Sequence, residues 1–469
     1  MVFSSLIFLF AYLPAVWLIY FIVPRKGKNL VLFLVSLFFY AWGEPIYVLL
    51  MLASLTLAYL FGLSIGEYRE EKSRRAKIFT AISVCVSLSF LFFFKYYNFF
   101  ALNLSRLPKV NIPTIASLVL PIGISFYTFQ IISYTVDVYR GDCEAQRNYI
   151  NFGAYVTLFP QLIAGPIVRY TEIDEQLTSR RENVDDFAAG ILRFVVGLAK
   201  KVLIGDALAA GFVYFQDSGA VQPTVVGAWL TVILYSLHLY YDFSGYSDMA
   251  IGLGRMFGFR FPENFNYPYI SKSITEFWRR WHISLSSWFR EYVYIPLGGN
   301  RVGTFKRYRN LAIVWLLTGF WHGADWNFVL WGVYFAIILI LERAFLLKFL
   351  ENSPRFFAHL YSLFLIGVGF LIFSHNDLGA AFFTFLALFG VGIESFATST
   401  ALYTLIRLAP LILLSAIGAT PLPNRIWKNA QARHPRLQSA TIILCLALFA
   451  VCVAYLADST FSPFEYTQF

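Results

Sequence analysis

Long apolar runs separated by short basic segments dominate this chain of 469 residues. An α-helix needs about 20 consecutive apolar residues to cross the hydrocarbon core of a bilayer, and runs of that kind recur from Val2–Val23 to Thr441–Ala457. Charged residues make up only 14% of the chain, against about 25% in soluble domains. These features exclude a soluble, disordered or collagen-like chain and predict an all-α polytopic membrane protein.

We expect roughly eleven transmembrane helices, together with re-entrant and interfacial segments. The candidate helical segments, in chain order, are Val2–Val23, Leu30–Trp42, Ile46–Gly66, Ile78–Leu104, Ile115–Tyr139, Phe187–Tyr214, Val225–Phe257, the helices between Leu311 and Leu347, Phe356–Phe373, Ala380–Ile393, Leu402–Gly418 and Thr441–Ala457. Proline and glycine interrupt Tyr149–Pro166, so this segment is expected to be re-entrant. No internal repeat or second domain is evident, so residues 1–469 are expected to form one membrane domain.

The basic residues gather in short loops, and the formal net charge is +10. The positive-inside rule places such loops in the cytoplasm, which predicts this location for Arg25–Lys28, Glu67–Lys77 and Arg301–Arg309. It also accounts for the basic excess without a nucleic-acid partner. No basic residues precede the first apolar run, so we expect a retained helix and not a cleaved signal. Four cysteines give no disulfide framework.

Polar side chains within apolar segments are costly and often functional. Three of the six histidines are of this kind: His238, His282 and His322. Counting from Leu311, eleven residues at 1.5 Å rise place His322 about 16 Å deep, near the middle of a ~30 Å core. The neighbouring Gly319 and Gly323 permit close backbone approach or a helix break. A neutral imidazole can take and return a proton, so His322 is a candidate base; the alternative is a buried histidine held by a neighbouring helix.

The segment that contains His282 combines tryptophan and arginine in the way that is typical of a membrane interface. Arg279, Arg280 and Arg290 can bind the phosphates of a donor or lipid headgroups, and we assign them to donor binding together with Trp321. His282 itself is a second active-site candidate, with interfacial anchoring as the alternative.

Three other polar residues lie on one apolar segment and are expected to be structural: His238, Asp242 and Asp248. A buried carboxylate needs a partner, so both aspartates should be paired. The sequence has no Walker A loop, HExxH or GxSxG motif, and no spacing typical of a metal site.

An ordered set of motifs, covering most of the chain, resembles the membrane-bound O-acyltransferase family. The motifs that carry the resemblance are Trp281–Ser286, Phe289–Asn300 and Gly319–Gly332. Four further motifs resemble the bacterial alginate O-acetyltransferase branch of that family: Tyr40–Gly43, Phe159–Val168, Tyr241–Ala250 and Asn264–Pro268.

The resemblance implies a multi-helix fold around a central tunnel, with His322 as the catalytic histidine and His282 at the second active-site position. Similar proteins pass an acyl group, here expected to be acetyl, from a cytoplasmic thioester to an acceptor outside the cytoplasm, through an SGNH-type partner transferase. The implied donor is acetyl-CoA or an acyl-phosphopantetheine carrier protein, with no bound cofactor. The implied acceptor is a polysaccharide such as alginate, and the location is the bacterial inner membrane.

Two alternatives stay open on the sequence. One is a D-alanyl-transfer-like member of the same family, which would use an acyl carrier protein. The other belongs to a different class: a proton-coupled transporter whose buried histidines and aspartates form a proton relay.

Overall fold

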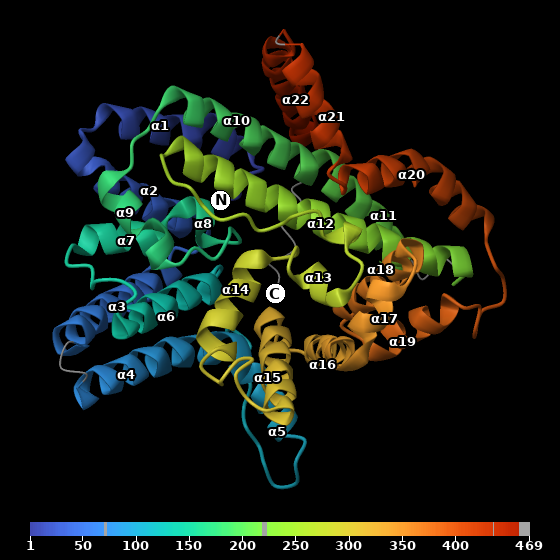
Figure 1. Ribbon diagram of the computed structural model, residues 1–469, viewed down its shortest axis with the longest axis horizontal. Coiled ribbons are helices and arrows are strands. Elements are labelled where there is room, and N and C mark those ends of the chain that lie inside the picture. Colours follow the sequence, from blue (N-terminus) through green and yellow to red (C-terminus); the bar gives the residue numbers. More distant parts are fainter. Residues whose placement is uncertain (70–72, 218–222, 435, 459–469) are drawn as a thin grey trace. The chain divides into compact units, whose positions relative to one another are not determined.

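The computed structural model describes residues 1–69, 73–217, 223–434 and 436–458, and these form helices joined by loops, of which the one between Leu104 and Ile124 is long (Figure 1). Six helices in this part of the chain are long and apolar enough to cross a membrane: Tyr47–Arg69, Arg74–Leu104, Trp326–Asn352, Arg355–Ser374, Ser399–Gly418 and Ser439–Asp458. The prediction of an all-α, multi-pass membrane protein is therefore confirmed. The number of eleven crossings stays a prediction.

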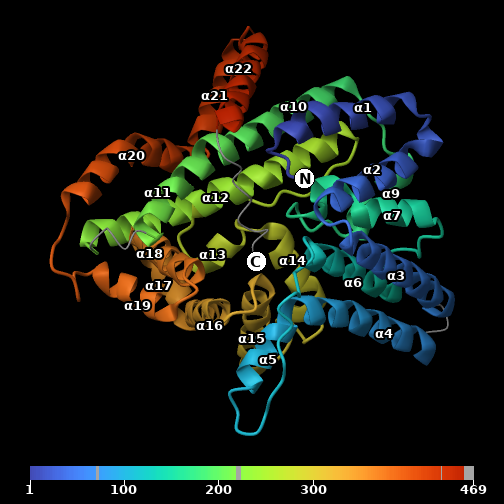
Figure 2. The same cartoon turned by 180° about the vertical axis from the view of Figure 1, so that it is seen from behind.

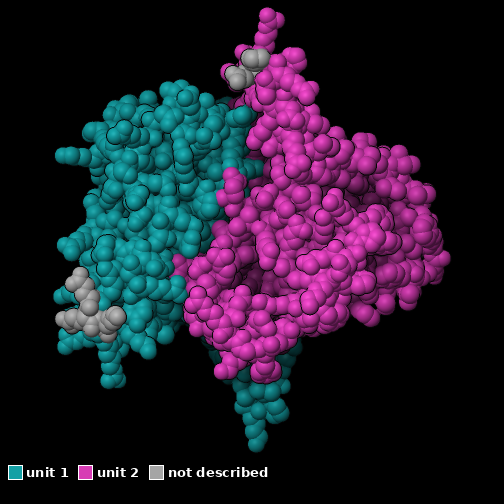
Figure 3. Space-filling model, in the orientation of Figure 1, with its two compact units in different colours: residues 1–194, 247–262, 466–468 teal, residues 195–246, 263–465, 469 magenta. Residues whose placement is uncertain are grey.

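The chain divides into two compact units, shown in different colours in Figure 3. Within the described part, unit 1 comprises residues 1–194 and 247–262. Its helices are α1 (Leu13–Ile22), α2 (Lys28–Gly43), α3 (Tyr47–Arg69), α4 (Arg74–Leu91), α5 (Tyr97–Leu104), α6 (Ile124–Arg140), α7 (Tyr149–Thr157), α8 (Phe159–Leu162) and α9 (Tyr170–Ser179). Two helices, α10 (Val184–Ala199) and α12 (Val225–Met256), contribute residues to both units.

Within the described part of the chain, unit 2 contains residues 195–246 and 263–458, and it carries both candidate catalytic histidines. Its remaining helices are α11 (Asp206–Asp217), α13 (Ile274–Trp278), α14 (Ile283–Phe289), α15 (Thr304–His322), α16 (Trp326–Leu341), α17 (Leu347–Asn352), α18 (Arg355–Ser374), α19 (Leu378–Ala387), α20 (Ser399–Gly418), α21 (Leu422–Arg433) and α22 (Leu437–Asp458). The two opposite views in Figures 1 and 2 show α13, α14, α15 and α16 gathered together within this unit.

Three of the predicted spans differ from the structure. The helix predicted over Ala380–Ile393 is α19, which ends at Ala387, and a turn with Gly390 at φ +80° follows it. The helix predicted over Ile115–Tyr139 begins only at Ile124, because Pro121 and Gly123 precede it and Gly123 has φ +74°, outside the helical region. The first apolar run is helical over Phe8–Ile22, which is shorter than the predicted Val2–Val23.

The segment predicted to be re-entrant folds into two short buried helices, α7 and α8. The chain bends between them at Leu158, and Pro160 is accepted because it lies in the first turn of α8. Nine residues of α7 at 1.5 Å rise extend only about 14 Å, less than half of a ~30 Å core. Neither α7 nor α8 is therefore long enough to cross a bilayer.

Turns of π-helix interrupt several helices, and such turns are frequent at functional sites. Two of them lie in unit 2 next to the segments of interest: η6 (Arg290–Tyr294) follows α14, and η7 (Glu342–Leu346) follows α16. An inserted residue shifts the register of the side chains that follow it. Arg290 and Glu342 therefore begin segments whose side chains are placed differently from those of a regular helix.

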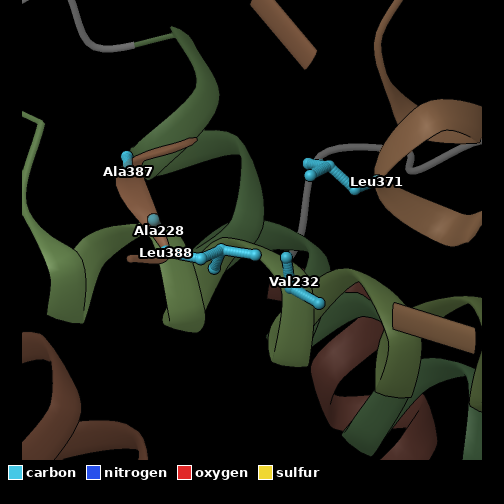
Figure 4. Packing of buried hydrophobic residues seen from close by; sticks show 5 residues of the cluster. All are labelled: Ala228, Val232, Leu371, Ala387 and Leu388. Carbon is cyan, nitrogen blue, oxygen red and sulfur yellow. The ribbon is translucent and has the colours of Figure 1, made fainter. Parts of the chain in front are cut away.

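A small apolar cluster packs the C-terminal end of α18 against α12 and α19 (Figure 4). Its buried members are Ala228, Val232, Leu371, Ala387 and Leu388. Leu371 lies two residues before Phe373, which contacts the candidate catalytic histidine. The cluster thus helps to hold the end of α18 that carries Phe373.

The predicted topology can be tested at Ser73 in the basic loop Glu67–Lys77 and at Thr304 in the basic loop Arg301–Arg309. Ser73 is the N-cap of α4, and Thr304 is exposed at the start of α15; Lys72 of the second loop lies outside the described residues. With the exposed Cys85 replaced by serine, Ser73→Cys and Thr304→Cys should resist an impermeant maleimide on intact cells and react after permeabilisation. Reaction of either cysteine on intact cells would overturn the topology.

Candidate active site

The motif around His322 folds as a helical hairpin. Helix α15 ends at His322, the backbone of Gly323 is extended, and α16 begins at Trp326. Asp325 caps the second helix, because its carboxylate accepts a hydrogen bond from the backbone N–H of Trp326 at 2.6 Å. The helix break expected beside His322 is therefore present, and it leaves the imidazole at the very end of a helix.

Two glycines let the helices of this hairpin touch backbone to backbone. A Cβ added to Gly319 would lie 2.4 Å from the carbonyl oxygen of Phe328, and one added to Gly332 would lie 2.6 Å from that of Trp315. Real Cβ atoms do not approach so closely, so only glycine fits at this crossing. The position of His322, one turn beyond Gly319, depends on this approach.

His322 is held among aromatic rings and is only 4% exposed. The ring centroids of Trp321, Trp331 and Phe373 lie 4.9, 5.0 and 5.3 Å from its own, each close to edge-on. The side chain of Asn327 donates a hydrogen bond to the carbonyl of Phe373 at 3.2 Å, which ties the start of α16 to the end of α18. Three aromatic rings therefore pack around the imidazole and restrict its rotation.

His282 has an unusual backbone and a defined ring orientation. It is the N-cap of α14 with φ +45°, in the left-handed region, and it is 1% exposed. Strain of this kind in a non-glycine residue often marks a functional site. Its Nδ1 lies 3.2 Å from Oδ1 of Asn264, which also accepts hydrogen bonds from the backbone N–H and the hydroxyl of Ser284.

Because this oxygen is an acceptor, Nδ1 of His282 carries the proton and Nε2 carries the lone pair. Burial lowers the pKa of His282 to about 3, so the imidazole is neutral at physiological pH. The sequence pointed to His282 but not to Asn264, whose place in the Asn264–Pro268 motif was the only signal for it.

Trp321 joins the two histidines. Its ring centroid lies 5.9 Å from that of His282 and 4.9 Å from that of His322. The structure thus brings together three predicted site residues that come from two motifs about 40 positions apart. Trp321 is close to both imidazoles and does not line the pocket described next, so its assignment to donor binding stays a prediction.

A pocket of about 260 Å³ lies against this group. Its polar lining includes Arg279, His282, Arg290, Asn300, Thr318 and Arg343. Thr318 is one helical turn before His322, so the pocket reaches the same end of α15. No aspartate or glutamate is among the described residues that line it. A pocket with three guanidinium groups and no carboxylate favours an anionic ligand.

The predicted arginines differ in their partners. Arg279 is exposed, and its guanidinium group has no ion-pair or hydrogen-bond partner among the residues that the structure describes. Arg290 pairs with Glu291 at 2.6 Å. Arg280 is not in the pocket lining; it pairs with Glu276 at 3.0 Å and donates to a backbone carbonyl. Arg279 is therefore the arginine most available to a ligand.

Arg343 is a lining residue that the sequence did not single out. Its guanidinium donates hydrogen bonds to the hydroxyl of Tyr294, at 3.1 Å, and to the side-chain oxygen of Asn300. Its one sequence signal was the charged pair Glu342–Arg343, which follows the apolar run Phe328–Leu341.

The three polar residues expected to be structural all have partners. Asp242 pairs with Lys201 at 3.4 Å, and Asp248 of unit 1 pairs with Arg193 at 2.8 Å. Nδ1 of His238 lies 2.9 Å from the carbonyl oxygen of residue 205. Among the described residues, no three His, Cys, Asp or Glu side chains are grouped as metal ligands.

A multi-pass helical protein with two buried imidazoles beside a cationic pocket has the features of a membrane-embedded group-transfer enzyme. Comparison with known proteins agrees: the model of the membrane-bound O-acyltransferase family matches residues 144–374. The chain is 41% identical to a protein named "probable alginate O-acetylase AlgI" from Azotobacter vinelandii, over the whole of both chains. It therefore belongs to the membrane-bound O-acyltransferase family, and the resemblance seen in its motifs is confirmed.

Two other relatives are more distant. A peptidoglycan O-acetyltransferase of Helicobacter pylori is 37% identical over 81% of this chain and 78% of its own. A teichoic acid D-alanyltransferase of Bacillus subtilis is 30% identical over 48% of this chain and 59% of its own. The protein is thus an O-acyltransferase, and its reaction requires an acyl donor.

Proposed function

We propose that this protein passes an acetyl group from a cytoplasmic thioester across the membrane for the O-acetylation of an extracellular polysaccharide such as alginate. The observation that carries the proposal is the pocket lined by Arg279, Arg290 and Arg343, which lies against the His282–Trp321–His322 group. The full-length relatives named as alginate O-acetylases support the same acceptor class.

His322 acts as the base in this proposal. The hydroxyl oxygen of the acceptor attacks the thioester carbonyl carbon, the hydroxyl proton passes to His322, the carbon–sulfur bond breaks, and the leaving sulfur takes that proton. The products are an ester and a free thiol. Charge that develops on the carbonyl oxygen needs a donor; the indole N–H of Trp278 is one candidate, since Trp278 lines the pocket and this N–H has no acceptor among the described residues.

The size and charge of the pocket suit the slender, phosphate-bearing phosphopantetheine arm of an acyl donor. Drug-sized ligands occupy about 300–1,000 Å³, so 260 Å³ suits a slender arm better than a whole nucleotide. Acetyl-CoA and an acyl carrier protein present the same phosphopantetheine thiol, and both carry phosphate for Arg279. The D-alanyltransferase relative supports the carrier protein as the second candidate donor.

The whole chain, residues 1–469, acts as one domain in the bacterial inner membrane. The acyl group leaves on the extracytoplasmic side to an SGNH-type transferase, which modifies the polysaccharide. The cytoplasmic assignment of the Arg301–Arg309 loop supports donor entry from that side, because this loop adjoins Asn300 of the pocket.

Arg279→Gln should raise the apparent KM for the donor about tenfold or more, because it removes a charge-assisted contact to phosphate. Arg280→Gln is the matched neighbour and should leave the donor KM unchanged, since Arg280 faces Glu276. Initial rates over a range of donor concentrations, at equal amounts of inserted protein, measure both. A wild-type KM in the Arg279→Gln protein would show that this arginine does not bind the donor.

A further inference from the structure

A buried carboxylate ties together two walls of the pocket. Glu342 begins η7 after α16 and is 0% exposed. Its Oε1 accepts the backbone N–H of Ile274 at 2.7 Å, and its Oε2 accepts both the backbone N–H and the hydroxyl of Thr275, at 2.7 and 2.6 Å. The hydroxyl of Tyr361 adds a weaker contact to Oε1 at 3.2 Å.

These four contacts are all made by donors, and they engage both carboxylate oxygens. A carboxylate buried in an apolar helix is expensive unless its oxygens are satisfied, and hydrogen bonds to an ionised acceptor are about twice as strong as neutral ones. The partners at Ile274 and Thr275 are 68 and 67 residues away in the sequence. Glu342 is therefore a specific long-range tie and not a local helix contact.

The tie lies next to residues that contact the proposed ligand. Thr275 lines the pocket on one side, four residues before Arg279, and Arg343 lines it on the other side, immediately after Glu342. Neighbouring side chains of a helix point about 100° apart, so Glu342 binds α13 while Arg343 lines the pocket.

We propose that Glu342 is a positioning residue that holds α13, and with it Arg279 and His282, at the distance from α16 that the donor arm requires. This inference rests on the proposed function of the pocket as the donor site. Glu342 touches neither donor nor acceptor; it acts through the segment that it anchors.

Glu342→Gln tests the proposal because glutamine keeps the size of the side chain but turns one acceptor into a donor. The NH2 group of glutamine then faces a backbone N–H group of Ile274 or Thr275, so that hydrogen bond is lost and the other oxygen keeps its own. The donor KM should rise about tenfold, with a smaller change in kcat. Glu342→Asp, which keeps the charge at a shorter reach, should give an intermediate KM.

Tyr361→Phe is the matched control. It removes only the 3.2 Å contact and leaves the three contacts to α13 in place, so its donor KM should stay within about twofold of wild type. A wild-type donor KM in both inserted Glu342 variants would overturn the proposal. If the Glu342→Gln protein does not insert, a wild-type donor KM in the Glu342→Asp protein is by itself enough to overturn the proposal.

A readout without acyl transfer separates this inference from the proposed function. Ser286 lines the pocket, so Ser286→Cys, with Cys85 replaced by serine, reports its accessibility to a thiol reagent. Glu342→Gln should raise the labelling rate and Tyr361→Phe should not. An unchanged rate would contradict the anchor itself. A wild-type protein that consumes no thioester donor would instead contradict the proposed function, whatever the labelling shows.

Discussion

Replacement of His322 by alanine is expected to lower the rate of acyl transfer by at least about 10²-fold, the lower range for loss of a general base. The chain should still insert, because α15 and α16 are held by the glycine crossing and by the tie between Asn327 and Phe373. Initial rates at equal amounts of inserted protein measure the effect. His434→Ala, in an exposed loop after α21, is the control and should keep wild-type turnover.

The same experiment can contradict the assignment of the base. An inserted His322→Ala protein with near-wild-type turnover would show that His322 is only a packed side chain among Trp321, Trp331 and Phe373. A loss of the same size in His434→Ala would show that the assay reports something other than the site.

Gly319→Ala is expected to damage both stability and activity. The new Cβ would lie 2.4 Å from the backbone oxygen of Phe328, so the hairpin must open. Overpacking of this kind costs about 1–3 kcal/mol, and a shift of about 1 Å at a catalytic group can cost about 10²-fold in rate. Thermal unfolding in detergent should show a lower Tm, and the rate of transfer should fall with donor KM little changed.

Gly303→Ala is the matched control for that substitution. It lies at the N-cap of the same helix, and a Cβ there meets nothing within 4 Å. Its Tm and rate should equal those of the wild-type protein. Wild-type values for Gly319→Ala as well would mean that the backbone contact between α15 and α16 does not set the position of His322.

The helices were largely predictable because apolar length is a local property. The span predicted over Val225–Phe257 is α12, Val225–Met256, and that predicted over Leu402–Gly418 is α20, Ser399–Gly418. Helix α15 begins at Thr304, seven residues before Leu311, but three basic residues occupy its first turns. Its apolar part still starts near Leu311, the residue from which the depth of His322 was counted. The position of His322 near the middle of the membrane stays a prediction.

The candidate site was predictable where polar residues stand within apolar segments or where motifs named its residues. His282 and His322 were found in both ways and Trp321 beside them, and the structure brings them together. Arg279 and Arg280 are adjacent in the sequence, and only the packing of α13 shows that one lines the pocket while the other pairs with Glu276. No local pattern links Glu342 to a segment 68 residues away, so this contact could not be predicted.

Acyl transfer from a thioester to a hydroxyl is the reaction on which the proposed function depends. The test uses purified protein in proteoliposomes. It receives acetyl-CoA or an acyl carrier thioester with a labelled acyl group, together with the polysaccharide or the partner transferase as acceptor. We predict release of free thiol and ester-linked label on a polysaccharide or a partner transferase, both lost in His322→Ala. No consumption of either thioester, together with solute uptake driven by a proton gradient, would contradict the proposed function and establish the transporter alternative.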